Sequence, residues 1–419
     1  MDNGCEVFAK LPNPNAGAAR FTIASEVATR KLLSEVLKAP VPRVLAWSFD
    51  AASNHVGAEY IIEEKAHGVR LGSVWTQWPR NAKLQLITQL IDIQNTLANV
   101  TFDMHGCIYF RDDLRALGEE PEEANIQSAT ASIPGIFAIG PLTTGELWNG
   151  VRSGMNLDRG PWNDPSDYTL ALSRNEIAYI KSYAITRMNY YRSLNTQEHP
   201  EGGLALLTQY MKVAPYLIPQ STNEAVCNEV ASNNVLTHPD LHLDNIFVDP
   251  ETLQITRIVD WQSAFVAPLF YHADVPRMCT HRGHLREGWV VPERSEEFDT
   301  LSAEEQRKID DDLESQVLHK YYEAQMYKRS PRYCFTNEDV ELHSKEEENI
   351  NGVGKLLTLF RDEFMLPVGG MVEPKDYEIA QKNNRKFKDI FIGLAKDDEE
   401  KELFTKLWPY QEPADTEGL

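Results

Sequence analysis

The sequence lacks the cysteine pairs and the long apolar runs that mark several large protein classes. Its five cysteines are far apart and form no CxxC pair, so neither a zinc site nor a disulfide framework is indicated. A reducing compartment is the simpler inference. No apolar run approaches the roughly 20 residues that are needed to span a bilayer. The first residues are typical of neither a signal peptide nor an arginine-rich presequence.

Positive charge is also scarce. The chain has 41 Lys and Arg against 63 Asp and Glu, which gives a formal net charge of −22. This balance argues against a nucleic-acid or anionic-membrane partner, because both need a basic surface. What the sequence does have is length and apolar content: 419 residues, 42% of them hydrophobic, are enough for two or three packed globular units.

The first part of the chain predicts a small unit of strands and one helix. An Asp-Asn-Gly turn at residues 2–4 is followed at once by a predicted strand over residues 5–9, which ends at Lys10. Ser25 is expected to cap a helix over residues 26–38. Two further strands are expected at 43–49 and 58–63. The pattern then changes from strands to helices.

That change predicts a domain boundary, with one unit at residues 1–66 and a second, mainly helical unit at 67–419. Residues 118–168 are rich in Gly, Pro, Asn and Asp and predict an irregular insertion. The charged tail from Asp397 is expected to be loose. Helical periodicity is present at residues 81–97, 175–191, 204–212, 304–328, 346–364 and 375–395.

The stretch 235–262 gathers three oxygen-bearing side chains. We expect a hairpin to fold Asp260 back beside the loop that holds Asp240 and Asn245, so that the three groups could share one ion. The predicted elements are two short strands, a turn and a returning strand, at residues 235–237, 246–248, 249–252 and 254–259.

Residues 238–245, HPDLHLDN, fit the pattern H-x-D-L-x-x-x-N, and this pattern indicates phosphoryl transfer. That chemistry needs a carboxylate to accept the proton of the attacking hydroxyl, and oxygen ligands for a magnesium ion. Asp240 would be the base, with Asn245 and Asp260 as the metal ligands. Far upstream, Lys10 and Glu26 could form the pair that holds a lysine against the nucleotide phosphates.

The motif IVDW at 258–261 follows this loop, and with it the chain resembles the aminoglycoside phosphotransferase and choline-kinase-like branch of the protein-kinase-like fold. The segments ASEVATRKLL, AEYIIEE, LDRGPW and HPDLHLDNIFVD are similar to a fungal subgroup named for altered inheritance of mitochondria. The resemblance implies a two-lobed α+β fold, ATP and Mg²⁺ as cofactors, and a mitochondrial location; the cytoplasm is the alternative, because no presequence is visible.

The resemblance also implies further site residues. His242 stands where Ser/Thr kinases place a lysine for the γ-phosphate, which implies a secondary catalytic role. Glu64 and Ala66 correspond to the hinge whose backbone meets adenine. The family's glycine-rich hairpin should precede Lys10, where only nine residues lie. The first lobe is therefore expected to be truncated at its start.

Other interpretations remain open. The short N-terminus favours a pseudokinase-like binding or scaffold protein without turnover. The mixed set of His and Asp side chains at 238–244 would suit a zinc- or iron-dependent hydrolase. Asp240, Asn245 and Asp260 could also be ordinary turn residues, and His238 could brace the loop.

The leading hypothesis is an ATP-dependent kinase that acts on an unidentified small-molecule hydroxyl. Acidic charge mildly favours a cationic acceptor, such as an amino sugar or a choline-like compound, through electrostatic steering. No nucleic-acid partner and no integral membrane segment are expected. The sequence leaves the oligomeric state open.

Overall fold

The structure is a computed structural model of the 419-residue chain. It divides into two compact units, Met1–Cys334 and Phe335–Leu419. The boundary expected near residue 66 lies inside the first unit and remains a prediction. The residues that the structure describes are 6–13, 17–121, 125–128, 131–188, 197–214, 233–271, 275–283, 285, 288, 291–294, 297–329, 377–393, 395 and 398–407.

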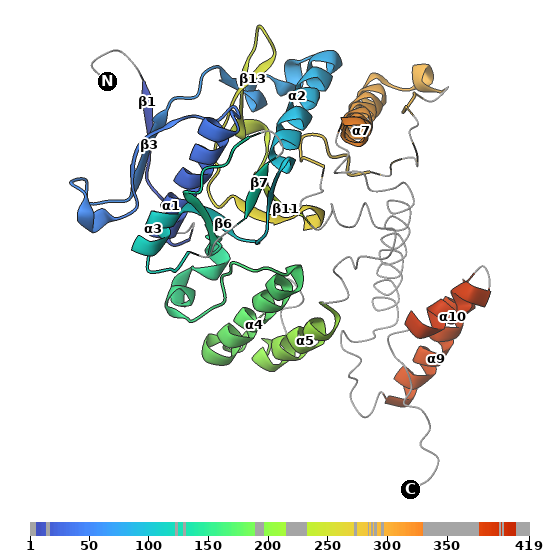
Figure 1. Ribbon diagram of the computed structural model, residues 1–419. Coiled ribbons are helices and arrows are strands. Elements are labelled where there is room, and N and C mark those ends of the chain that lie inside the picture. Colours follow the sequence, from blue (N-terminus) through green and yellow to red (C-terminus); the bar gives the residue numbers. More distant parts are fainter. Residues whose placement is uncertain are drawn as a thin grey trace. The chain divides into compact units, whose positions relative to one another are not determined.

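The first unit begins with a three-stranded antiparallel sheet and one long helix (Figure 1). The strand order is β1-β3-β2, with β1 at Val7–Lys10, β3 at Tyr60–Glu64 and β2 at Val44–Ser48. Helix α1, Ala19–Lys31, packs Ile23 and Val27 against Val44 and Ile61 of this sheet. A π-helical turn, Leu32–Val36, continues α1.

The start of α1 corrects a prediction. The helix begins at Ala19, and Ser25 lies buried in its middle rather than capping its first turn. Small side chains explain the difference, because Ala24, Ala28 and their neighbours let the helix approach both the sheet and strand β6, Cys107–Phe110. Burial of this face outweighs the capping preference of a single serine.

The hairpin predicted in the central stretch is confirmed. Strands β12, Ile246–Asp249, and β13, Gln254–Ile258, pair antiparallel, with Ile246 opposite Ile258. The Asp249 carboxylate closes the turn by accepting hydrogen bonds from the backbone N–H groups of Glu251 (2.9 Å) and Thr252 (3.3 Å). Strand β4, Val69–Arg70, completes this sheet beside β12.

Three further small antiparallel sheets complete the first unit. The sheet that carries the loop before β12 has the order β14-β11-β5-β7. Its strands are β14 Phe265–Pro268, β11 Asn234–Thr237, β5 Val100–Phe102 and β7 Ile126–Ser128. The two pairs are β6 with β8, Phe137–Gly140, and β9, Arg187–Met188, with β10, Gln197–Glu198.

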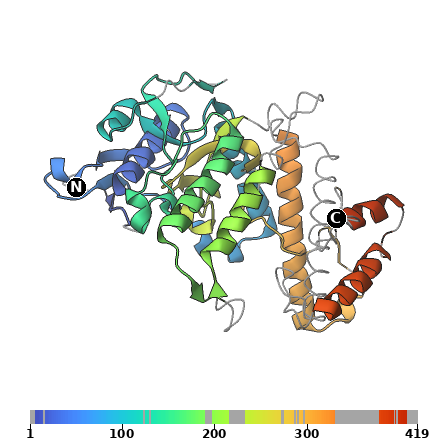
Figure 2. The same cartoon turned by 90° about the horizontal axis from the view of Figure 1, so that it is seen from below.

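Helices cover these sheets. Helices α4 and α5 contact each other, as both Figure 1 and Figure 2 show, and α2 contacts α7. No helix in the described ranges is long and apolar enough to cross a membrane. Besides α1, the helices within the described residues of this unit are α2 Arg80–Ala98, α3 Arg111–Ala116, α4 Pro165–Tyr183, α5 Pro200–Val213 and α7 Ala303–Arg329.

Several predicted boundaries shift. The helix expected at 175–191 begins at Pro165, where the Asp164 carboxylate accepts a hydrogen bond from Ser166 N–H (2.6 Å), and it ends at Tyr183. The segment 118–168 contains β7, β8 and short 3₁₀ turns. In the second unit, the described part of the tail that was predicted to be loose forms helix α10, Asp398–Leu407, which follows α9, Tyr377–Gly393. Residues 408–419 of that tail lie outside the described residues. The helix predicted at 346–364 lies outside the described residues.

The α+β class is thus confirmed. The largest apolar core lies between α2, the small sheets and α7, and it includes Trp261, of which 1% is exposed. The indole N–H of Trp261 donates to the Ile258 carbonyl at 3.0 Å, so the end of β13 is fixed from the core side.

Candidate functional site

Lys10, the last residue of β1, joins two carboxylates that lie far apart in the sequence. Its Nζ atom is 3.1 Å from Glu26 Oε2 on α1 and 2.9 Å from Asp260 Oδ1 after β13, which are 16 and 250 residues away along the chain. Burial alone would lower the pKa of Lys10, but the two carboxylates outweigh it and raise the pKa. Lys10 therefore keeps its positive charge.

Asp260 holds an unusual backbone conformation. Its φ is 63°, in the left-handed region that residues other than glycine rarely adopt. The buried Trp261 beside it and the hydrogen bond from Val259 N–H to the Asn245 carbonyl (2.9 Å) hold the chain in this bend. The bend leaves the Asp260 carboxylate 52% exposed beside Lys10, where it can reach an ion.

The loop from His238 to Asn245 is pinned to the end of β13. His238 Nε2 lies 2.8 Å from the Val259 carbonyl, which can only accept, so Nε2 carries the proton. Nδ1 is therefore free to accept the N–H of Asp240 at 3.1 Å. Burial lowers the pKa of His238 and keeps the ring neutral, as these two bonds require. Both ring nitrogens are occupied, so His238 braces the loop.

Asn245 completes the loop. Its Nδ2 donates to the Asp240 carbonyl at 2.9 Å and its backbone N–H donates to the His242 carbonyl at 3.0 Å. Because the amide nitrogen is engaged, the amide oxygen is the atom left for an ion. The side-chain oxygens of Asn245 and Asp260 are the donor type that Mg²⁺ prefers. Asn245 directly precedes β12 and Asp260 follows β13, and the ends of these two strands are paired.

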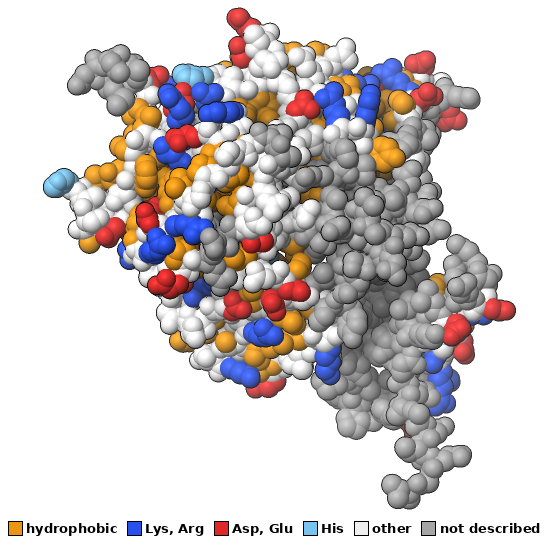
Figure 3. Space-filling view, viewed as in Figure 1, with side chains coloured by type: hydrophobic (Ala, Val, Ile, Leu, Met, Phe, Trp, Pro, Cys, Tyr) orange, Lys and Arg blue, Asp and Glu red, His pale blue; other side chains and the backbone are white. Residues whose placement is uncertain are grey.

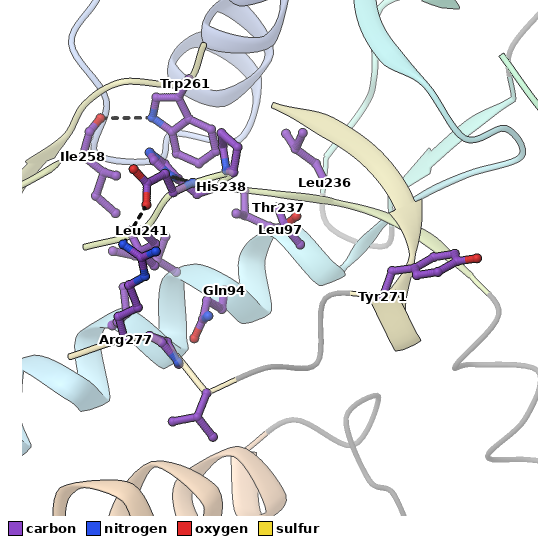
Figure 4. A pocket seen from close by; sticks show the side chains of 16 residues that line it. Gln94, Leu97, Leu236, Thr237, His238, Leu241, Ile258, Trp261, Tyr271 and Arg277 are labelled. Carbon is purple, nitrogen blue, oxygen red and sulfur yellow. Dashed lines mark hydrogen bonds and ion pairs between the residues drawn. The ribbon is translucent and has the colours of Figure 1, made fainter. Parts of the chain in front are cut away.

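Asp240 carries a carboxylate that is 57% exposed. His242 Nε2 is 3.5 Å from its Oδ2, while His242 Nδ1 accepts the N–H of Asp244 at 3.2 Å. On the other side, Arg277 Nη1 lies 3.8 Å from Asp240 Oδ1. Asp240 and Arg277 both line a cavity of about 350 Å³ beneath the loop (Figure 4).

Glu64 and Ala66 lie at the end of β3 and in the link to β4. The carboxylate of Glu64 pairs with Arg257 Nη2 at 3.2 Å and accepts the Arg43 backbone N–H at 3.3 Å. Burial raises its pKa, but these contacts outweigh the effect and lower it. The Glu64 side chain is therefore paired with Arg257. Ala66 is half-buried and has only backbone groups to offer a ligand.

Arg30 is a second cation beside Glu26, and the sequence did not reveal its role. Arg30 Nη1 lies 3.6 Å from Glu26 Oε1 and hydrogen-bonds Glu63 on β3, while Nη2 donates to the Pro42 carbonyl at 2.9 Å. Only 1% of the Glu26 side chain and 3% of the Arg30 side chain are exposed. The four-residue spacing of Glu26 and Arg30 was a visible signal for the local pair, but nothing in the sequence pointed to Glu63.

The zinc- or iron-binding set suggested by the His and Asp side chains at 238–244 is not formed among the described residues. Among the described residues, His, Cys, Asp and Glu form no group of three that could hold a metal ion. The engaged nitrogens of His238 explain why the mixed His and Asp pattern does not become such a site.

Comparison with known proteins gives distant relatives. No family model matches the chain. A subtelomeric hrmA-associated cluster protein of Aspergillus fumigatus is 28% identical over 99% of this chain and 94% of its own length. Altered inheritance of mitochondria protein 9, mitochondrial, is 26% identical in Candida tropicalis, over 65% of this chain and 45% of that protein. In Saccharomyces cerevisiae it is 22% identical over 93% and 62%.

Curated relatives thus include the fungal altered inheritance of mitochondria proteins. This confirms the predicted resemblance, although the chain spans only about half the length of these relatives. Among solved structures, an aminoglycoside-3'-phosphotransferase of type VIII shows a TM-score of 0.31 and 16% identity, covering 77% of this chain and 86% of that one. An aminoglycoside phosphotransferase from Streptomyces rimosus gives 0.29 and 13%, with coverages of 78% and 86%.

Replacing Arg30 by Met should destabilise the protein by about 3–5 kcal/mol, because Glu63 would remain buried without its cation. The double variant Arg30→Met with Glu63→Leu should recover much of that loss. Chemical denaturation measures both. Arg43→Met is the control, because its pair with Glu64 is exposed and should contribute less than about 1 kcal/mol. Simple additivity of the two changes would contradict the pairing.

His238 should make stability depend on pH. Its folded pKa is lowered from about 6.5, so the unfolded chain takes up the proton first as the pH falls. Stability should be complete above about pH 6.5 and decline as the pH falls through the folded pKa, by at most about 1.4 kcal/mol per pH unit. His238→Gln should flatten this slope in thermal unfolding between pH 7.5 and 5. His55→Gln, at an exposed turn, should leave the slope unchanged; an equal slope in both variants would contradict the assignment.

Proposed function

We propose that the protein is an ATP- and magnesium-dependent phosphotransferase that acts on the hydroxyl of a small molecule. The observation that carries the proposal is the position of Lys10 between Glu26 and Asp260, at 3.1 and 2.9 Å, next to a loop with an exposed Asp240. A cation, an ion-binding carboxylate and a base are the groups that phosphoryl transfer needs.

In this proposal each residue of the site has a separate role. Asp240 orients the acceptor hydroxyl and takes its proton as the oxygen–phosphorus bond forms and the bond from the γ-phosphorus to ADP breaks. Asn245 and Asp260 would hold Mg²⁺, which when bound neutralises phosphate charge. Lys10, kept in place by Glu26, would turn from Asp260 to the α- and β-phosphate oxygens.

The remaining site residues take secondary roles. His242 keeps Nε2 toward the Asp240 side because Nδ1 is engaged with the Asp244 N–H, so Nε2 would donate to a phosphate oxygen during transfer. Glu64 and Ala66 would offer backbone groups to adenine. Because the Glu64 side chain is already paired with Arg257, it would shape the hinge without touching the base.

The relatives' names support a location and a source. Because Altered inheritance of mitochondria protein 9 is named mitochondrial in several yeasts, we infer that this chain is also fungal and works in mitochondria. Fluorescence microscopy of the full-length native protein with a C-terminal fluorescent tag tests the location. Signal confined to the cytosol would contradict it.

A binding protein without turnover is the second candidate, and the direct contact between Lys10 and Asp260 favours it. A permanent pair would occupy both the phosphate-binding cation and the metal ligand. Calorimetry with Mg-ATP separates the two, because a phosphotransferase must break this pair and bind the nucleotide. Absence of binding by the full native chain would favour the second candidate.

Asp240→Asn should lower acceptor-dependent ADP release by about 10²- to 10⁴-fold, the usual range for a positioned general base. Mg-ATP affinity should be unchanged, because Asp240 is assigned to the acceptor side. Asp244→Asn is the matched control: it lies four residues later, is exposed, and should release ADP at nearly the original rate. If the unsubstituted protein is active and Asp240→Asn releases ADP at the same rate, Asp240 is not the general base.

A further inference from the structure

The cavity beneath the loop is lined by Asp240, the proposed base. It holds about 350 Å³ and opens between the loop at 238–241, helix α2 and the segment at 275–277. This volume lies at the lower end of the range for small-molecule sites. In Figure 4, Trp261 and His238 lie on one side of it, with Gln94 and Leu97 of α2 across from them.

Most of the cavity wall is apolar. Leu90, Ile93 and Leu97 of α2 face it, together with Leu236, Ile258 and Trp261 from the loop side. The Gln94 amide oxygen is already the acceptor of the Tyr322 hydroxyl at 3.0 Å. Among the residues that line the cavity, Asp240 is the one carboxylate and Arg277 the one guanidinium.

This lining does not suit a polycationic acceptor. Several ammonium groups would have to lie against aliphatic side chains without carboxylate partners, and burying an unpaired charge is costly. The net charge of −22 belongs to the whole chain, and Figure 3 shows acidic and basic side chains both spread over one face of the molecule. At the cavity itself, the carboxylate in the lining is that of Asp240. The cationic acceptor favoured by net charge is therefore not supported at the cavity.

Arg277 is placed for a ligand. Its side chain is 80% exposed, and the 3.8 Å from Nη1 to Asp240 Oδ1 is too long for a hydrogen bond. Within the described part of the chain it makes no hydrogen bond, so its fork of donors is available to a carboxylate or phosphate.

The segment that carries Arg277 is fixed in position. Cys279 N–H donates to the Pro276 carbonyl at 2.7 Å, and the hydroxyl of Thr280 donates to the Val275 carbonyl at 2.9 Å. His281 ties the segment to α7, because its Nδ1 lies 2.7 Å from the Ser315 hydroxyl. Arg277 therefore projects from a fixed backbone.

We propose that the acceptor is a hydroxy acid with an apolar tail, and that its anionic group lies within two or three carbons of the hydroxyl. The hydroxyl would bind Asp240, the anion Arg277, and the tail the apolar wall. The short spacing follows from the closeness of the Asp240 and Arg277 side chains. This inference rests on the proposed phosphotransferase activity.

The test uses three probes that differ in charge: 3-hydroxyoctanoate, its methyl ester, and 1-aminooctan-2-ol. Calorimetry measures binding of each to the full-length protein and to Arg277→Gln. The acid should bind the unsubstituted protein about tenfold more tightly than the ester, as expected for a charge-assisted pair. In Arg277→Gln, the affinity for the acid should fall to that for the ester, and the affinity for the ester should not change.

Arg282→Gln is the matched control, because Arg282 is an exposed arginine of the same segment that does not line the cavity. It should leave the preference for the acid intact. The proposal is overturned if the amine binds best, if the acid binds no better than the ester, or if the acid keeps its advantage in Arg277→Gln.

ADP release with Mg-ATP and each probe separates this inference from the proposed function. If the acid binds through Arg277 but releases no ADP, the hydroxy-acid site stands and the phosphotransferase proposal fails. If the amine stimulates ADP release and the acid does not, the phosphotransferase proposal stands and the hydroxy-acid inference fails.

Discussion

A buried carboxylate constrains the first part of this structure. Glu26 has 1% of its side chain exposed, on a helix that also buries Ile23, Ala24, Val27 and Ala28. A carboxylate removed from water costs several kcal/mol unless cations and donors replace the solvent. Lys10 from β1 and Arg30 from the next turn of α1 meet that need from two sides. Strand β1, helix α1 and strand β3 are joined by this network, because each supplies a charge to it.

The same network reaches the other end of the chain through Lys10. Its second partner, Asp260, stands at the bend after β13, where a φ of 63° would be unfavourable without support. The support comes from Trp261 in the core and from the loop, which His238 and Asn245 attach to Val259. The backbone that carries Asn245 and Asp260 is therefore held by main-chain bonds, so a change of partner at Lys10 need not disturb the loop.

The sequence predicted best where contacts are local. The hairpin and its Asp249 turn depend on groups that lie close together in the sequence, and their spacing is visible in the chain. The roles assigned to Asp240, Asn245 and Asp260 remain predictions. The start of α1 was misplaced, because Ser25 has the capping preference of a helix N-terminus while the packing of small residues decides the actual boundary. Glu63 and Arg277 could not be found at all, because their partners lie 33 and 37 residues away with no pattern between them.

Net charge and local lining lead to different conclusions about the ligand, and distance decides between them. The acidic excess acts on a ligand still in solution, where salt screens it beyond about 10 Å. Once a ligand is in the cavity, its nearest charges are one carboxylate and one guanidinium, Asp240 and Arg277. If Asp240 is engaged by the reacting hydroxyl, Arg277 is the charge left to select the acceptor. The residues that line the cavity therefore indicate the charge of the acceptor better than the net charge of the chain does.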